Sequence, residues 1–437
     1  MSDLGPTVAA RRAPTTGIRR LWFDERVAPS LWFVPSLFVV ASLVVSRVVV
    51  GIDRARDLDR APAWLLAADS DAAATFSATI AAAMLSFSAV VFSTTLVAIQ
   101  LAGGQYSPRV VRVFVRSRLT QCTLGLFLAT FVFAVAGMVE ERSGDDAYVA
   151  AVTIAIVYVL VGATLFMFIA FVFGMSRILR VQYLVARVTK DGRAALADAF
   201  DETATLRVAA PAVDEAGPVL TNRGGVGVVQ SVDVAGLART ARGAGVRLHV
   251  LVEFGEYVGR GTPIARVVSG PAEGLTADDV ASSFLLGAER TMTNDPGFVF
   301  RQLADIAIRA LSPAVNDPTT AVQCIDRITD LLGDVGRCPD PSGWYLDDRG
   351  EARVRFTQPG LARLMRLAYV EIIRYGADSP QVVRRLRAAF DVLDAQVRDD
   401  VRPVIAELHS MLDRTSTDAL PSSFRDVASR PDGHGLG

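Results

Sequence analysis

Four stretches of the sequence contain no Asp, Glu, Lys or Arg, and this absence constrains the fold more than any other feature. They are residues 27–46, 72–108, 119–139 and 147–176. A helix needs about 20 apolar residues to cross the hydrocarbon layer of a membrane. A buried helix of a soluble protein rarely stays uncharged on every side over this length. We therefore predict four transmembrane helices, near residues 31–50, 73–102, 119–139 and 148–175.

The overall composition agrees with a membrane protein. Hydrophobic residues make up 51% of the chain, and the mean hydropathy is +0.35. These values argue against both a disordered chain and an ordinary soluble protein. The formal net charge is −1, which gives no basic footprint for nucleic acid. We expect the lipid bilayer to be the main partner, with no nucleic-acid partner and no specific protein partner that the sequence identifies.

The positive charges lie on one side of the predicted spans. Residues 1–190 carry 18 positive and 12 negative side chains. Most of the positive ones fall in the N-terminal arm, in the loop after the second span and directly after the fourth. Because positively charged loops stay in the cytoplasm, we expect both termini on the cytoplasmic side of a bacterial inner membrane.

The remaining sequence predicts a cytosolic α+β region. We expect a small β module followed by a mainly helical domain. The segment LVEFGEYVGRGTPIARV resembles half of a barrel-sandwich hybrid, the fold of biotinyl and lipoyl carriers. Those carriers modify a lysine, and the single lysine here is Lys190, so we interpret the module as structural. The predicted order is a disordered arm (1–20), a transmembrane domain (21–190), the β module (200–272), the helical domain (273–414) and a disordered tail (415–437).

The helical domain should contain six helices and one short β excursion. The excursion is expected at residues 344–357. The helices are predicted at 276–293, 297–312, 317–334, 359–376, 379–399 and 403–414.

A polar stripe follows the second predicted span. At 100° per residue its five members fall within about 60° of one another: Thr75, Thr79, Ser86, Ser93 and Gln100. A weaker polar line runs through Ser77, Ser88 and Thr95. Small and hydroxyl residues allow helices to pack closely in a membrane. They can also line a pore when several copies surround one axis. Both interpretations remain open.

The next loop carries a basic face of three residues at helical spacing: Arg109, Arg112 and Arg116. At a cytosolic interface such a segment could bind lipid phosphates or concentrate anions at a pore mouth. The alternative is that these arginines only set the topology.

Two predicted helices in the cytosolic region meet at a polar corner. The first carries a charge ladder at i, i+4 and i+8: Arg301, Asp305 and Arg309. Asn316 or Asp317 then caps the second helix, with Pro318 at its first turn. A purely structural corner explains every residue. The functional alternative is a ligand site that uses the side-chain oxygens of Asn316, Asp317, Thr319 and Thr320.

Motifs for catalysis and metal binding are missing from the sequence. Its three Cys and three His are widely scattered, and GxSxG, HExxH and P-loop patterns do not occur. We therefore expect no enzyme activity, no metal site and no cofactor.

Proton-coupled carriers usually place an acidic residue or a histidine at membrane depth. The last three charge-free stretches contain no such residue.

Two segments resemble an uncharacterised family of predicted bacterial multi-pass membrane proteins, a domain-of-unknown-function family. One is VVFSTTLVAIQLAGGQYSPRVVRVFVRSRLTQCTLGLFLATFVFAV at 90–135, and the other is FRQLADIAIRALSPAVNDPTTAVQCIDRI at 300–328. The resemblance implies a multi-pass protein with a cytosolic C-terminal region and implies no activity. Our leading hypothesis is a homo-oligomeric passive channel with a cytosolic regulatory domain. The alternative is a membrane-anchored scaffold or sensor.

Overall fold

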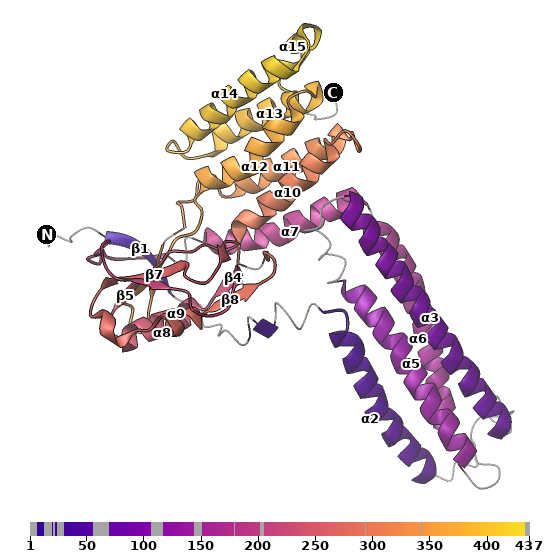
Figure 1. Cartoon of the computed structure of the whole chain (residues 1–437). Helices are drawn as coiled ribbons and strands as arrows, with labels where there is room; N and C mark the ends of the chain where they lie inside the picture. Colours follow the sequence, from indigo (N-terminus) through magenta and orange to yellow (C-terminus); the bar gives the residue numbers. More distant parts are fainter. Residues whose placement is uncertain are drawn as a thin grey trace. The chain divides into compact units, whose positions relative to one another are not determined.

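The chain folds into two compact units, which the computed structural model shows in Figure 1. We call Arg26–Tyr183 the membrane unit, and Met1–Glu25 together with Leu184–Gly437 the α/β unit. The structure describes residues 7–12, 20, 22–23, 30–55, 70–105, 117–143, 151–178, 180–201, 205–292, 294–341 and 343–432.

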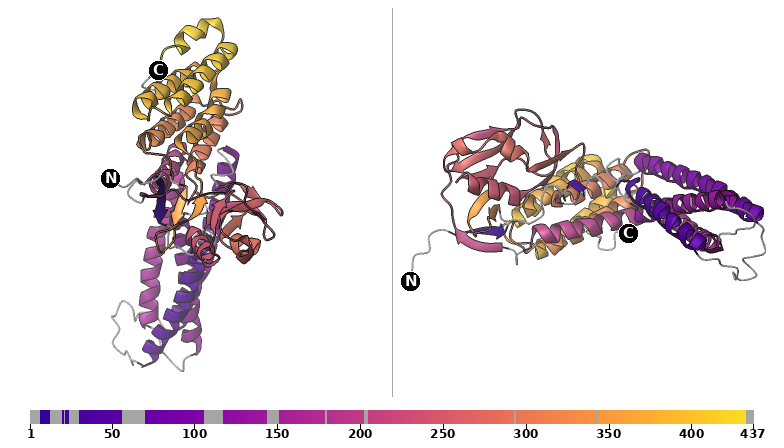
Figure 2. Two further views of the ribbon diagram at one scale, coloured as in Figure 1. Left: turned by 90° about the vertical axis from the view of Figure 1, so that its left-hand side faces the viewer. Right: turned by 90° about the horizontal axis from the view of Figure 1, so that it is seen from below.

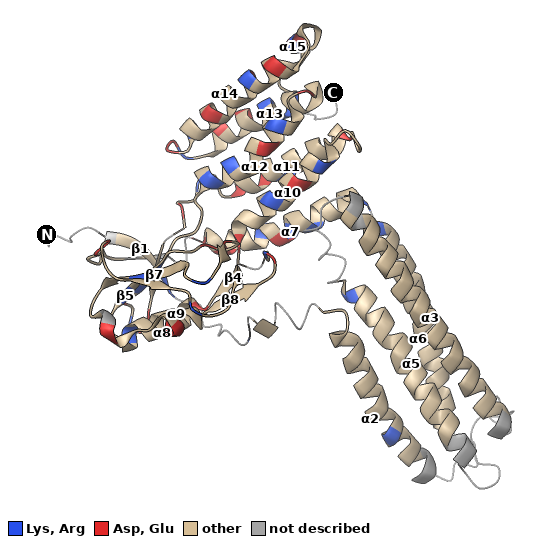
Figure 3. Cartoon of the chain, in the orientation of Figure 1, with Lys and Arg blue, Asp and Glu red and all other residues tan. Residues whose placement is uncertain are grey.

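The membrane unit consists of four long helices in its described part. They are α2 (Phe33–Ala55), α3 (Ser70–Gln105), α5 (Arg118–Ser143) and α6 (Ala151–Ile178). Each is long and apolar enough to span a membrane, which confirms the four predicted spans. Figure 3 shows how few charged residues these helices carry. Helix α3 has 36 residues and continues through the glycine pair at 103–104 before it ends.

Helix α5 packs against each of the other three helices. Gly125 permits the approach of α2, since a Cβ atom there would lie 3.0 Å from the ring of Phe38. The Ser42 hydroxyl then donates a hydrogen bond to the carbonyl oxygen of Ala129 at 2.7 Å. On the other side, the Phe127 ring stacks on Phe87 of α3, with centroids 5.8 Å apart. Small residues and aromatic rings therefore hold the bundle together.

The described part of the α/β unit contains two sheets. Its seven-stranded sheet has the order β2-β1-β9-β10-β5-β7-β3, and its three-stranded sheet has the order β6-β4-β8. Helix α8 contacts β5, β9 and β10. The large sheet comprises β1 (Thr7–Arg12), β2 (Thr205–Ala209), β3 (Val219–Thr221), β5 (Arg247–Val250), β7 (Pro263–Ser269), β9 (Trp344–Leu346) and β10 (Ala352–Phe356). The remaining elements here are β4 (Gly227–Val232), β6 (Tyr257–Val258), β8 (Phe284–Gly287), α8 (Val234–Gly243) and α9 (Ala277–Ala281).

Three predictions about this unit need correction. The arm predicted to be disordered contains β1, which pairs with β2 and β9. The helix predicted at 276–293 is replaced by the short α9 and by β8, which pairs with β4. The short β segment predicted at 344–357 within the helical domain belongs instead to the β module, because β9 and β10 join its large sheet. In each case the pairing partner is distant in sequence.

The remaining helices stack in layers, as Figures 1 and 2 show. Helix α10 packs on α11 and α12, α12 on α14, and α13 on α11, α14 and α15. Helix α15 lies within the tail that was predicted to be disordered, which is a fourth correction. The helices are α10 (Pro296–Ala310), α11 (Pro318–Asp334), α12 (Leu361–Gly376), α13 (Pro380–Gln396), α14 (Arg402–Ala419) and α15 (Ser422–Ala428).

Helix α7 (Val181–Ala199) begins three residues after α6 ends and leads into the α/β unit. Gly192 of α7 lies so close to α10 that a Cβ there would overlap the Val299 side chain. Arg193 forms ion pairs with Asp330 at 2.5 Å and Asp334 at 2.8 Å on α11. Helix α7 is thus packed onto the first layer of the helical stack.

Candidate functional site

Helix α3 faces the interior of the membrane unit through a seam that repeats alternately every three and four residues. This spacing keeps one face of a helix against its neighbours. The seam is buried and consists of Ala74, Ser77, Ala81, Met84, Ser88, Val91, Thr95 and Ala98. The hydroxyls of Ser88 and Thr95 donate to backbone carbonyl oxygens four residues earlier, at 2.8 and 2.7 Å. The weaker polar line of the sequence therefore belongs to packing within the chain.

The main polar stripe lies on the opposite face of α3. At 100° per residue, its mean direction is roughly 170° from that of the buried seam. All five members are exposed in the single chain: Thr75, Thr79, Ser86, Ser93 and Gln100. The Thr79 hydroxyl donates to the carbonyl oxygen of Thr75 at 2.7 Å, and the Ser86 hydroxyl donates to that of Ala82 at 3.0 Å. Within the described part of the chain, the side chains of Thr79, Ser86, Ser93 and Gln100 are therefore exposed and not packed against the bundle.

The outward face of α6 has a different character. Val159, Phe166 and Phe173 repeat every seven residues there, with exposed fractions of 72%, 74% and 69%. Such a face suits contact with lipid chains. The α3 stripe has hydroxyls at the equivalent spacing, with the exposed apolar residues Val90 and Leu96 on either side of it. A polar strip between apolar borders suits a neighbouring helix or water better than lipid.

The basic face predicted in the loop after α3 lies outside the described residues. This applies to Arg109, Arg112 and Arg116. The described chain resumes at residue 117, and Arg118 begins α5.

The charge ladder predicted on α10 forms ion pairs within that helix and with the neighbouring helix α12. Arg301 of α10 contacts Asp305 at 2.8 Å. It also forms a two-pronged pair with Glu371 of α12, with nitrogen–oxygen distances of 2.5 and 2.9 Å. The hydrogen bond to Glu371 is the main cause that raises the pKa of Arg301 above its ordinary value. Arg309 lies in the last turn of α10. The ladder therefore joins the first two layers of the helical stack.

The corner between α10 and α11 has the geometry of a helix cap. Asn316 has a φ of 48°, a left-handed conformation that asparagine tolerates better than most residues. The Asp317 carboxylate accepts hydrogen bonds from the backbone nitrogen of Thr320 at 3.1 Å and from its hydroxyl at 2.6 Å. Thr319 lies in the same first turn and is partly buried. These contacts agree with the structural interpretation of the corner.

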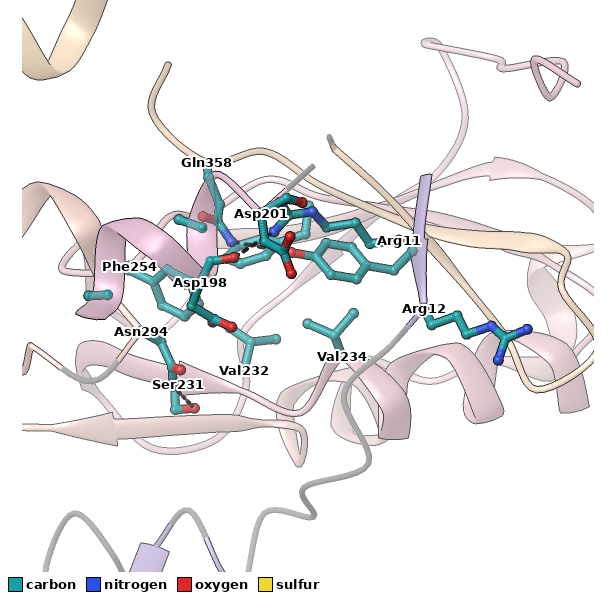
Figure 4. A pocket seen from close by; sticks show the side chains of 14 residues that line it. Arg11, Arg12, Asp198, Asp201, Ser231, Val232, Val234, Phe254, Asn294 and Gln358 are labelled. Atoms are coloured by element: carbon teal, nitrogen blue, oxygen red, sulfur yellow. Dashed lines mark hydrogen bonds between the residues drawn. The ribbon is translucent and has the colours of Figure 1, made fainter. Parts of the chain in front are cut away.

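One cavity was not anticipated from the sequence, and Figure 4 shows it from close by. It has a volume of about 200 Å³ and lies within the α/β unit. Residues from β1, the end of α7, β4, β9 and β10 line it. No local motif could have revealed it, because each of these segments contributes only one to four residues.

Polar contacts connect the walls of this cavity. The Asn294 amide donates to the Ser231 hydroxyl at 2.8 Å, and the Gln358 amide donates to the Tyr345 hydroxyl at 3.2 Å. The Arg11 guanidinium donates to the backbone carbonyl oxygens of Asp198 at 3.0 Å and of residue 201 at 2.6 Å. Arg11 thereby caps the carbonyl end of α7 and connects it with β1. Among the described residues, no group of three or more Asp, Glu, His or Cys could hold a metal ion.

Four apolar spans joined to a mixed α/β unit define an integral membrane protein of the multi-pass class. The chain belongs to the family described as Predicted membrane protein (DUF2254), whose model matches residues 28–392. Its relatives include uncharacterized proteins of Mycobacterium bovis and Mycobacterium tuberculosis strain H37Rv, each 28% identical over 333 residues and 74% of this chain. The match spans 63% of the length of these curated relatives. No solved structure matches the chain.

Proposed function

We propose that the protein is a homo-oligomer of the bacterial cytoplasmic membrane, with both termini in the cytoplasm. In the oligomer, the α3 stripes of several copies surround a common axis and form the wall of a passive pore. The α/β unit then acts as a cytosolic regulatory domain. The observation that carries this proposal is the outward direction of Thr79, Ser86 and Ser93, on the face opposite the intrachain seam.

The chemistry of the stripe supports a pore better than a lipid-facing surface. Ser86 and Thr79 satisfy their hydroxyl hydrogens through their own helix, which leaves oxygen lone pairs directed outward. Gln100 has an exposed carboxamide that makes no hydrogen bond to any described residue. An unpaired amide in hydrocarbon costs several kcal/mol. Water or a neighbouring copy would remove that cost.

The transport would be passive. Residues 72–108, 119–139 and 147–176 contain no Asp, Glu, Lys, Arg or His. A proton relay or an ion-coupled cycle normally needs such a group at membrane depth. Hydroxyl oxygens can still replace part of the hydration shell of a permeating ion or polar solute.

Cross-linking in native membranes tests the assembly. In a variant without Cys122, Cys324 and Cys338, we expect Ser86→Cys to form a disulfide-linked dimer on mild oxidation. The matched control is Ser176→Cys on α6. Its native hydroxyl is also exposed and also donates to a carbonyl four residues earlier, at 3.0 Å. Equal cross-linking of both variants would contradict an interface on α3.

Conductance of the purified oligomer in planar bilayers tests the pore. We expect Ser86→Leu and Ser93→Leu each to reduce the single-channel conductance strongly, because each places an apolar side chain in the wall. Ser176→Leu should leave the conductance unchanged. A cross-linked oligomer that conducts nothing would refute the pore, and so would equal conductance of all three variants.

A membrane-anchored scaffold or sensor is the second candidate. The layered helices α10–α15 favour it, because stacked helix pairs present extended binding surfaces. Tyr375 of α12 is 52% exposed on this stack. Co-purification of one defined protein, lost on Tyr375→Ala and without any conductance, would support this function over the pore.

A further inference from the structure

We propose that one end of the three-stranded sheet carries a docking tip that contacts the surface of an anionic lipid bilayer. The sheet, whose strands β4 and β8 are labelled in Figure 1, ends there in two glycine-rich loops. We call the four exposed side chains at this end the tip: Arg223, Val226, Tyr257 and Arg260. The contact needs no pore, and it uses from the proposed function only the cytoplasmic position of the α/β unit.

The apolar part of the tip is the most exposed of the unit. Among the described large hydrophobic residues of the α/β unit, Tyr257 and Val226 have the highest exposed fractions, 65% and 54%. Val226 directly precedes Gly227, which pairs with Val258 beside Tyr257, so both side chains lie at the same end of the sheet. One exposed apolar residue needs no explanation, whereas neighbouring ones form a patch that marks a contact surface.

A buried asparagine holds the two loops of the tip together. Asn222 has an exposed fraction of 2%, and its side-chain amide donates to the carbonyl oxygens of Gly225 at 2.8 Å and Gly259 at 3.0 Å. These two glycines belong to different loops, one of which carries Arg223 and the other Arg260. The fold itself therefore brings the two arginines to one end of the sheet.

The charges of the tip are available for an external partner. Arg223 and Arg260 are exposed and make no ion pair with a described residue. The neighbouring carboxylate of Glu256 accepts a hydrogen bond from the backbone nitrogen of Glu253 at 3.0 Å, within its own turn. Glu289, which follows β8 at the same end, is exposed and limits the net positive charge. The contact therefore needs the apolar pair as well as the two arginines.

The chemistry of this surface fits the boundary between lipid headgroups and acyl chains. Tyrosine rings are enriched at the level of the headgroups. Guanidinium groups are attracted to anionic lipid phosphates while apolar neighbours enter the outer acyl region. A tip of one aromatic ring, one aliphatic side chain and two arginines supplies each of these parts.

The bilayer is also the partner that the chain keeps within reach. Helix α7 begins three residues after α6 ends, and its 19 residues extend about 28 Å. Because the α/β unit cannot diffuse away from the lipid, even a weak contact is populated at this high local concentration.

Fluorescence of the labelled full-length chain in nanodiscs tests the tip. In the variant without Cys122, Cys324 and Cys338, Val226→Cys carries an environment-sensitive dye. In nanodiscs that contain phosphatidylglycerol, we expect blue-shifted emission and quenching by lipids with a nitroxide near the headgroup. Both effects should be weaker in phosphatidylcholine alone and at high salt. The two leaflets of a nanodisc have the same composition, so the orientation of the chain does not affect the result.

Substitutions separate the tip from the general charge of the unit. Arg223→Gln combined with Arg260→Gln should lower the docking equilibrium at least tenfold, because each arginine near an anionic surface contributes about fivefold, or about 1 kcal/mol. Arg327→Gln combined with Arg374→Gln is the matched control at two other exposed arginines of the unit, and it should leave the quenching unchanged. Tyr257→Ser removes the ring and should weaken the quenching in both kinds of nanodisc.

Val213→Cys with the same dye is the control for position, because Val213 is a valine of the same unit with an exposed fraction of 41% outside the tip. Absence of quenching at Val226→Cys, equal quenching at Val213→Cys, or equal effects of the two arginine pairs would overturn the proposal. A spectral shift without lipid quenching would also overturn it, since that indicates contact with a second copy. The dye reports without any current, so a failed pore and a failed tip are distinguishable.

Discussion

The contact between α7 and α10 gives the sharpest quantitative prediction. Gly192 is buried on α7, and an added Cβ would lie 2.5 Å from the Cβ of Val299. Val299 has an exposed fraction of 0%, so its side chain cannot move aside into solvent. Gly192→Ala should therefore force the two helices apart, because a change of the Val299 rotamer does not move its Cβ.

Two effects of opposite sign determine the magnitude. Alanine in place of glycine inside a helix stabilises the helix by about 1 kcal/mol. Overpacking a well-filled core costs about 1–3 kcal/mol. Because the overlap at Gly192 is severe, we take the upper part of that range. The expected net effect is a loss of about 1–2 kcal/mol in the free energy of unfolding of the α/β unit.

Urea denaturation of the detergent-solubilised protein, followed by far-UV circular dichroism, measures this loss. Val299→Gly removes the Cβ that the added one would meet as well as both methyl groups, so the double variant should be more stable than the sum of the two single changes by about 1 kcal/mol or more. Gly243→Ala is the matched control, because a Cβ on this α8 glycine would meet nothing within 4 Å. Full stability of Gly192→Ala, or strict additivity with Val299→Gly, would refute the close packing of α7 on α10.

Two further predictions concern the α/β unit. Asp317→Ala removes the cap of α11 and should lower the free energy of unfolding by about 1 kcal/mol. Asn316→Gly should leave the stability nearly unchanged. A thermal melt in which Asn316→Gly is the less stable of the two variants would contradict the cap. Burial, followed by the charge of Arg355, lowers the pKa of His249. The unfolded chain therefore binds a proton first, and the contribution of neutral His249 to stability should be complete above pH about 6.5 and decline below it. Melts of His249→Gln between pH 5 and pH 7.5 should show a flatter profile, and an unchanged profile would exclude His249 as the cause.

The spans and most helices could be predicted because their signals are local. The spans predicted from the charge-free stretches agree with the apolar spans of α2, α3, α5 and α6 to within about four residues. Pro318, preceded by Asp317, marked the start of α11. In these elements the residues that determine the structure are adjacent in sequence, so composition and periodicity are sufficient.

Strand pairing and the cavity could not be predicted, since they depend on distant residues. Strand β1 has the short sequence TVAARR, and its two arginines and lack of a long apolar run suggest an exposed arm. It becomes part of a sheet because Thr7–Arg11 align with Thr205–Ala209, almost 200 residues later. The same holds for β8, which pairs with β4. By sequence alone, Arg11 is one of several arginines in the N-terminal arm, and only the fold brings its guanidinium to the carbonyl end of α7.

The sequence by itself determined that the chain crosses a membrane four times and that one span carries two polar lines. Charge-free length and 100° periodicity are properties of one helix and need no partner. Only the tertiary structure decided which line is buried: Ser77, Ser88 and Thr95 face the bundle, while Ser86 and Ser93 face outward. The physical reason is that the inner line alternates with Met84, Val91 and Ala98, which fill the space beside Phe127 and Phe171. Ser86 and Ser93 have no such apolar partners among the described residues of one chain, and the pore proposed above would place a neighbouring copy or water against them.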